Sequence, residues 1–358
     1  MAETMYDYYQ SQPQYMKRIV AKKDALFGAF GEFYAKAAPD RVYLCGSGSS
    51  YHASEASQEF MEVILGVEVS VIVPSQYRSL GSARPLVIAV SQSGRSINTL
   101  SALRDMKEKG AALASLTGWA DSPIGRAADC SVALDIDEEL VSPKTKGFTA
   151  TIASLYLMTL AAGLASGSIS RAEYDKWLEA IAASVEAGED NQRACKEFFD
   201  RHLESLKKAK SYLFVGKGIG ARVAGEAALK VLETIYVPSS AYEFEEYLHG
   251  PIYYMEKGMA LFITLPEDED KERAIRLSDM IRDISPNVYL VSYDQRLKGD
   301  NILNLRAADS YYMIPFSAVF PGQLVSSLIP AEMGITEHPI VRKLFDAMSI
   351  KTALPPRE

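Results

Sequence analysis

The chain has 358 residues, 48% of them hydrophobic, so it can bury one large core or two medium ones. Its formal net charge of −8 at pH 7 disfavours nucleic acid or an anionic membrane as the main partner, but leaves room for a small anion in a locally positive pocket. Three widely spaced cysteines without a CxxC pair are typical of a reducing cytoplasm. The N-terminus lacks a signal-peptide pattern, and we expect no charge-free apolar stretch of about 18 residues, so the prediction is a cytoplasmic protein.

Short apolar segments alternate with longer helical segments along the first half of the chain. Helices are predicted at 51–66 and from Ser96 to about Lys109. The predicted strands are 41–46, 68–74, 86–90, 112–118 and 130–136. Continuous apolar strands separated by helices indicate an α/β fold, in which a doubly wound parallel sheet is covered on both faces.

The second half repeats this plan. The segment 211–220 corresponds to 41–50, and 259–268 corresponds to "PLVIAVSQSG". Two further segments, "VYLVSYD" (288–294) and "YYMIPF" (311–316), are predicted as strands that close the second sheet. We therefore expect two similar doubly wound domains in tandem. The predicted division is a helical arm at 1–30, a first domain at 31–167, a helical linker at 168–210, a second domain at 211–330 and a C-terminal tail at 331–358.

Two serine-rich turns follow strands of the first half. A loop between a parallel strand and a helix offers backbone N–H groups and the positive end of the helix dipole, which suit a phosphate. The ordinary alternative is N-capping, because serine is a favoured cap. The sequence completes neither a G-x-x-x-x-G-K-[ST] nor a G-x-G-x-x-G motif at these turns, so a nucleotide is the weaker prediction. The hydroxyls available to a phosphate are those of Ser49, Ser50, Ser91, Ser93 and Ser96. Arg95 either adds positive charge there or points to water.

The second half carries an acid–base set. Glu226, Lys230 and Glu233 fall on about one face of a predicted helix, and His249 follows sixteen residues after Glu233, before Gly-Pro. Proton transfer between adjacent sugar carbons needs a carboxylate, and ring opening needs a proton relay near neutral pH, which suits histidine. The ordinary alternatives are an exposed helix glutamate and a turn histidine.

These motifs resemble the tandem sugar isomerase (SIS) domain family, in particular the isomerase half of glucosamine-6-phosphate synthase. The resemblance rests on "GSGSSYHA" (46–53), "SQSGRS" (91–96), the E-x-A-L-K-x-x-E pattern at 226–233 and "HGP" at 249–251, and it covers about residues 40 to 350. It implies that Glu233 is the general base and that His249 assists ring opening from the neighbouring subunit, hence a homodimer with shared sites. It also implies supporting roles for Lys230 and Glu226. The residues that it assigns to the 6-phosphate are Ser50, Ser91, Gln92, Ser93 and Ser96, with Ser49 beside them. No metal or organic cofactor is implied.

The sequence departs from the family at two places. Pro143 and Lys144 replace Ala-Ser in the loop at 138–150, where Ser142 and Lys144 are candidates to line the pocket. The tail resembles the family's closing tail, and either Lys343 or Lys351 is a candidate to reach the sugar.

The predicted function is a phosphosugar enzyme that acts on an aminated hexose 6-phosphate. No glutaminase-length segment precedes residue 40, so we expect it to be independent of glutamine. A fructosamine-6-phosphate deglycase is favoured, with Glu243, Glu245 and Glu246 either near the amine or on a solvated helix face. The alternatives are a glucosamine-6-phosphate deaminase, an aldose–ketose phosphosugar isomerase and a sugar-phosphate sensor without catalysis.

Overall fold

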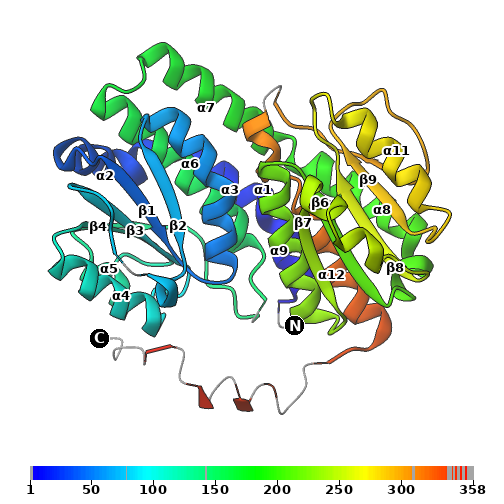
Figure 1. The fold of residues 1–358 in the computed structure, drawn as a ribbon. Coiled ribbons are helices and arrows are strands. Elements are labelled where there is room, and N and C mark those ends of the chain that lie inside the picture. Colours follow the sequence, from blue (N-terminus) through cyan, green and yellow to red (C-terminus); the bar gives the residue numbers. More distant parts are fainter. Residues whose placement is uncertain are drawn as a thin grey trace. The chain divides into compact units, whose positions relative to one another are not determined.

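A computed structural model describes residues 3–77, 79–141, 143–308, 311–336, 341, 343–344, 347–348 and 351–352. Within them the chain forms two five-stranded sheets (Figure 1). The first sheet has the order β2-β1-β3-β4-β5 and the second β10-β9-β8-β6-β7, and all neighbouring strands are parallel. Both orders are 2-1-3-4-5 when each sheet is numbered from its own first strand. The predicted tandem doubly wound α/β fold is therefore confirmed.

The strands occupy short apolar segments. Those of the first sheet are β1 (Arg41–Cys45), β2 (Glu68–Ile72), β3 (Pro85–Ser91), β4 (Ala112–Thr117) and β5 (Cys130–Ala133). Those of the second sheet are β6 (Ser211–Gly216), β7 (Ser239–Glu243), β8 (Met259–Thr264), β9 (Val288–Ser292) and β10 (Ile302–Asn304). The central strands β3 and β8 are almost wholly buried, as expected for a sheet with helices on both faces.

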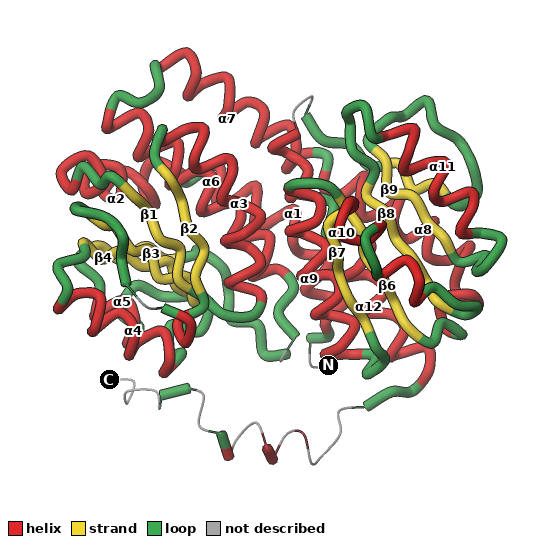
Figure 2. The backbone as a smooth tube through the Cα atoms, in the orientation of Figure 1, coloured by secondary structure: helices red, strands yellow, loops and turns green. Residues whose placement is uncertain are grey.

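Helices cover both faces of each sheet. In Figure 1, α3 and α6 lie on one face of the first sheet and α4 and α5 on the other; in Figure 2, α9 and α12 lie on one face of the second sheet and α11 on the other. The α-helices are α1 (Met5–Ala21), α2 (Lys23–Ala37), α3 (Ser49–Leu65), α4 (Ile97–Glu108), α5 (Pro123–Ala127), α6 (Lys146–Ser166), α7 (Arg171–Glu186), α8 (Gly188–Lys207), α9 (Ile219–Thr234), α10 (Phe244–Leu248), α11 (Lys271–Ile281) and α12 (Phe320–Met333). The 3₁₀ helices are η1 (Pro74–Gln76), η2 (Pro251–Tyr254) and η3 (Tyr311–Phe316).

One predicted strand is wrong. The segment 311–316 forms η3, and the three-residue β10 closes the second sheet instead. A short apolar run does not by itself distinguish a strand from a buried helical turn, and Met313, Ile314 and Phe316 are buried in η3. Pro315 also lacks the N–H group that a central strand needs.

The expectation about apolar stretches is wrong as well. By length and composition alone, the helical segments Lys146–Ser166 and Tyr311–Met333 are long and apolar enough to cross a membrane. In each, 83% of the apolar window is buried. Helix α6 packs against α2 and α3, and this packing accounts for a helix that is apolar on nearly every side.

The chain divides into two compact units, which we treat separately. The first-half unit comprises Gln14–Leu140, Lys146–Ala182 and Glu337–Glu358, and contains β1 to β5. The second-half unit comprises Met1–Pro13, Val141–Thr145 and Ala183–Thr336, and contains β6 to β10. The boundary between them falls inside α1, directly after Pro13. The division into an arm, two domains, a linker and a tail remains a proposal.

Candidate functional site

The two serine-rich loops lie at the same edge of the first sheet. Strands β1 and β3 are neighbours, with Cys45 opposite Ala89, and each strand is followed by its loop. The other neighbours are β2 for β1 and β4 for β3, so the two crossover connections leave in opposite directions. This is the topological switch point of a doubly wound sheet, where such folds bind ligands.

The first loop brings the chain to the start of α3. Gly48 has φ +58°, a left-handed conformation that favours glycine, and it stands at the N-cap. Ser49 and Ser50 therefore form the first turn of α3, where backbone N–H groups have no partner within the helix. The side chain of Ser50 is buried. With glycine at the cap, serine capping does not explain this loop.

The second loop is held in one shape by close packing. The N–H group of Gly94 donates to the carbonyl of Ser91 at 2.9 Å, and Gly94 has φ +59°. An ideal Cβ atom on Gly94 would lie 2.3 Å from the Cβ atom of Ser122, so only glycine fits. Ser93 Oγ accepts the N–H group of Arg95 at 3.3 Å. Ser96 is the N-cap residue of α4 but makes no side-chain cap bond, and its hydroxyl instead donates to Asn98 Oδ1.

Contacts with neighbouring segments join and support the loops. Asn98 Nδ2 donates to Ser47 Oγ at 3.3 Å and so connects the second loop to the first. Gln92 presents its carbonyl to the N–H group of Gly118 at 3.0 Å. Its side-chain amide lies against Gly147 in the first turn of α6, where an ideal Cβ atom would meet Gln92 Oε1 at 2.4 Å. Gln92 Nε2 is buried and has no hydrogen-bond partner among the residues that the structure describes.

The predicted acid–base set lies on α9 in the second-half unit. Lys230 Nζ is 2.5 Å from Glu233 Oε2 and 3.4 Å from Glu226 Oε1. The side chains of Lys230 and Glu226 are only 1% and 0% exposed, whereas that of Glu233 is 38% exposed. Burial opposes the charge on Lys230, but the carboxylates of Glu226 and Glu233 outweigh it and hold the pKa of Lys230 above its usual value. A buried ammonium thus fixes an accessible carboxylate.

His249 lies in the same unit, directly after α10. It is the C-cap residue, its N–H group donates to the carbonyl of Glu245 at 3.1 Å, and its side chain is exposed. Two glutamates of this stretch have partners within the unit, whereas Glu246 is exposed. Glu243 caps α10 by accepting the N–H groups of Glu245 and Glu246 at 2.7 and 3.2 Å. Glu245 forms an ion pair with Arg273.

The loop before α6 has a structural anchor. Glu139 is buried and accepts the N–H groups of Lys146 and Gly147 at 3.1 and 3.0 Å, so it satisfies the start of the helix. Lys144 Nζ donates to the carbonyl of Val141 at 3.1 Å. Ser142 lies outside the described residues.

The tail meets the second serine-rich loop. Lys351 forms an antiparallel backbone bridge with Ser96, and the N–H group of Thr352 donates to the carbonyl of Arg95 at 2.9 Å. The structure therefore pairs Lys351 with this loop, whereas Lys343 is an exposed residue in a helical conformation. Arg95 does not simply point to water, because its Nε donates to the carbonyl of Thr352 at 2.7 Å.

Sequence reasoning missed how the corresponding edge of the second sheet is occupied. Gly218, the N-cap of α9, has φ 53° and ψ −122°, close to the φ 58° and ψ −133° of Gly48. The hydroxyl of Tyr311 accepts the N–H group of Ile219 at 2.7 Å, in the first turn of α9. This edge thus keeps the backbone of a binding loop but fills it with a side chain of the same unit.

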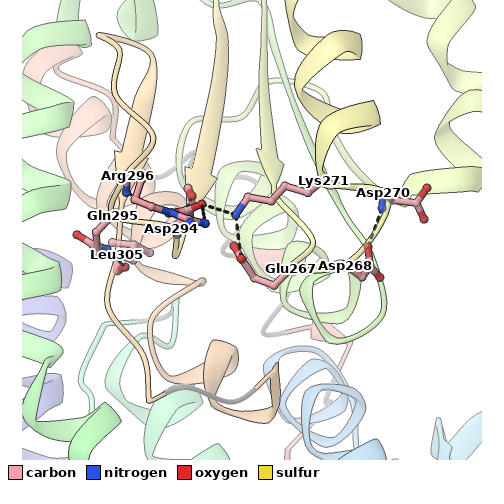
Figure 3. A network of polar contacts seen from close by, with 9 residues as sticks. Glu267, Asp268, Asp270, Lys271, Asp294, Gln295, Arg296 and Leu305 are labelled. Carbon is pink, nitrogen blue, oxygen red and sulfur yellow. Dashed lines mark hydrogen bonds and ion pairs between the residues drawn. The ribbon is translucent and has the colours of Figure 1, made fainter.

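Ion pairs occupy the rest of that edge. Lys217 Nζ lies 2.7 Å from Asp268 and 2.6 Å from Asp270. Figure 3 shows Lys271 between Glu267 and Asp294, each 2.9 Å away. The only sequence signal for this difference is the acidic run "PEDED" (266–270), at the position where the first half has "QSGRS" (92–96).

The sequence and the fold of this chain are similar to those of known proteins. Residues 36–161 match the family model of the SIS domain. An isomerizing glutamine–fructose-6-phosphate aminotransferase from Aquifex aeolicus is 28% identical over 302 residues, which cover 82% of this chain and 49% of that protein. The chain thus spans about half the length of this curated relative.

Two crystal structures share the whole fold. A candidate phosphosugar isomerase from Clostridium difficile 630 has a TM-score of 0.88 and 27% identity, covering 96% of this chain and 98% of that one. The C-terminal domain of glucosamine-fructose-6-phosphate aminotransferase from Francisella tularensis has a TM-score of 0.81 and 21% identity, covering 92% and 97%. The serine loops lie inside the region that matches the SIS domain, residues 36–161, and the chain as a whole shares the fold of these two structures.

Proposed function

We propose that the chain is an enzyme that acts on an aminated hexose 6-phosphate, with a 6-phosphofructosyl amine or amino acid as the favoured substrate. The observation that carries the proposal is the pairing of Glu233 with Lys230 on α9. Glu233 is 38% exposed, and its carboxylate lies 2.5 Å from an ammonium that is 1% exposed. A base that must take a proton from carbon has to be accessible and fixed in position, and this pairing supports both requirements.

The reaction follows from one proton transfer. In a 6-phosphofructosyl amine the carbonyl is at C2 and the amine at C1. Glu233 takes a proton from C1 while O2 gains one from water, which gives an enaminol. The proton returns from Glu233 to C2 and the nitrogen gives its proton back to water, which leaves an imine at C1 and a hydroxyl group at C2. Water adds to this imine, the C1–N bond breaks, and hexose 6-phosphate and the free amine leave. The balance is one water consumed for each amine released. His249 carries a proton to and from the ring oxygen when the ring opens.

The phosphate is assigned to the two loops of the first-half unit. No serine side chain caps either helix, so the hydroxyls of Ser50, Ser93 and Ser96 and the helix N-termini support an anion there. The buried Nε2 of Gln92 supports the same assignment, because a buried amide donor without a partner is costly and a ligand oxygen would satisfy it.

A substrate panel tests this function. Fructosyl-amino-acid 6-phosphates, glucosamine 6-phosphate and fructose 6-phosphate are incubated with the wild type, Glu233→Gln and Glu197→Gln, an exposed glutamate on α8 that serves as a control. We expect glucose 6-phosphate and free amine from the fructosamines. Glu233→Gln should lower kcat by about 10²–10⁴-fold with binding retained, and Glu197→Gln should match the wild type.

The other products decide between the alternatives. Ammonia with fructose 6-phosphate from glucosamine 6-phosphate would make the chain a deaminase. Interconversion of fructose 6-phosphate and an aldose, with no amine released, would make it an aldose–ketose isomerase. Tight binding without any product would make it a sensor, and the roles given to Glu233 and His249 would be withdrawn.

The proposal includes a cytoplasmic homodimer with shared sites. The support is the exposed side chain of His249, which is accessible to a neighbouring subunit, and the family resemblance. Inactive Glu233→Gln and His249→Ala chains, unfolded and refolded together in equal amounts, should regain about a quarter of wild-type activity, because half of the dimers are mixed and each holds one intact site. No regained activity would place both residues in one subunit's site.

A further inference from the structure

The C-terminal segment Lys351–Thr352 is joined to the second phosphate loop by an unusual concentration of hydrogen bonds. Nε and Nη2 of Arg95 both donate to the carbonyl of Thr352, the first at 2.7 Å. In return, the carbonyl of Arg95 accepts the N–H group of Thr352 at 2.9 Å and its hydroxyl at 3.4 Å. The next pair along, Ser96 and Lys351, forms an antiparallel bridge. Residues 257 positions apart in the sequence therefore pair like two short strands.

Arg95 lies inside the second serine-rich loop, so its hydrogen bonds connect the C-terminal segment directly to that loop. Arg95 stands between Gly94, whose backbone is held against Ser122, and Ser96, at the start of α4. Its half-buried guanidinium faces a neutral carbonyl, so its bonds are charge-assisted without forming an ion pair. A guanidinium offers two parallel donors to such an acceptor, which a lysine ammonium does not.

We propose that Arg95 is a positioning residue, which latches the C-terminal segment onto the phosphate loop and so holds Lys351 at the edge of the phosphate site. This inference rests on the proposed function for the identity of the ligand, but not for the latch itself. Because the latch and the phosphate use the same loop, 91–96, order at one favours order at the other. The coupling is reciprocal: if the latched tail increases the affinity for a sugar phosphate by some factor, the bound sugar phosphate should favour the latched state of the tail by the same factor.

Amide hydrogen exchange tests the latch without any substrate. The variants are Arg95→Ala, Arg95→Lys and, as a matched control, Arg104→Ala, which removes an exposed arginine of α4. Losing charge-assisted hydrogen bonds should speed exchange in the peptide that holds Thr352 by about 10- to 100-fold for Arg95→Ala. In Arg95→Lys the same peptide should exchange nearly as fast as in Arg95→Ala, because lysine lacks the two parallel donors of a guanidinium. Exchange in Arg104→Ala should match that of the wild type. Exchange in Arg95→Ala as slow as in the wild type would overturn the proposal.

A double-mutant cycle in the full chain separates a latch from a ligand contact. Thr352→Pro removes the N–H group that donates to Arg95. If Arg95 acts through the tail, Arg95→Ala raises KM in the wild-type background and adds nothing in the Thr352→Pro background. An equal rise in both backgrounds would show that Arg95 binds the ligand directly, against the proposal. If no hexose 6-phosphate is turned over by any variant, the proposed function fails, while the exchange experiment still decides the latch.

Discussion

Replacing Lys230 by methionine should expose how much the buried charge cluster of α9 contributes to stability. Methionine keeps about the length of the side chain and removes the ammonium that lies between two carboxylates. Glu226 then keeps its buried position, 0% exposed, without the cation 3.4 Å from it. Removing one partner of a buried ion pair costs about 3–5 kcal/mol, so we expect the free energy of unfolding to fall by about that amount.

A second lysine in the same unit provides the control. Lys196 pairs with Asp200 on α8 at 2.7 Å, with the same i,i+4 spacing, but the two side chains are 40% and 54% exposed. Exposed pairs of this kind contribute about 0–1 kcal/mol. Urea unfolding of Lys230→Met and Lys196→Met at pH 7 should therefore differ by at least about 2 kcal/mol, the difference between those two ranges. Equal losses would refute the reasoning that burial sets the cost.

The pH dependence gives an independent check. The pKa of Lys230 is raised in the folded chain, so its stabilising contribution is complete below the ordinary lysine pKa of about 10.4 and is lost only as the pH rises through the higher folded value. In Lys230→Met the buried carboxyl group of Glu226 can take up a proton instead. The loss in the free energy of unfolding of Lys230→Met relative to the wild type should therefore be smaller at pH 5 than at pH 8. A loss that grows on acidification would contradict the role given to the buried carboxylate of Glu226.

Three further predictions concern the first-half loops and the cysteines. Gly94→Ala should lower the free energy of unfolding by about 2–4 kcal/mol, because of the left-handed backbone and the clash with Ser122. Gly66→Ala, at φ +66° in open space, should lower it by only about 1–2 kcal/mol. Equal losses in urea unfolding would exclude the clash. Glu139→Ala should cost about 1–3 kcal/mol, because two N–H groups at the start of α6 lose a buried acceptor, and Glu139→Gln should recover part of it in the same assay. Burial raises the pKa of Cys45 and Cys195 to about 12 each, so both should resist a thiol reagent at pH 8 until the chain unfolds; fast native labelling would contradict their burial.

The fold was predictable where one physical signal dominates. Strands such as β3 and β8 are continuous apolar runs bounded by polar turns, and such runs have few other uses in an α/β chain. The short strand β10 was not predictable, since three residues give no period. The apolar η3 was mistaken for a strand because its buried residues serve a helical turn.

The candidate site was predictable in its motifs but not in its long-range contacts. The spacing of Glu226, Lys230 and Glu233 already places them on one helical face, and the structure adds which of them is accessible. The partner of Arg95 could not be found, because no local pattern connects residues 257 positions apart. For the same reason the sequence did not choose between Lys343 and Lys351.

Tyr311 gives the two similar sheets different thermodynamic dependence on their surroundings. On the proposed function, a sugar phosphate bound at the first edge stabilises the fold by an amount that grows with the logarithm of its concentration once that concentration exceeds Kd. The hydroxyl of Tyr311 and the N–H group that it accepts belong to the same chain. Its effective concentration is therefore constant, and the entropy of bringing the two groups together is lost during folding. On that proposal, one edge of the duplicated architecture is filled only when a ligand is present, whereas the corresponding edge carries a permanent partner from its own unit.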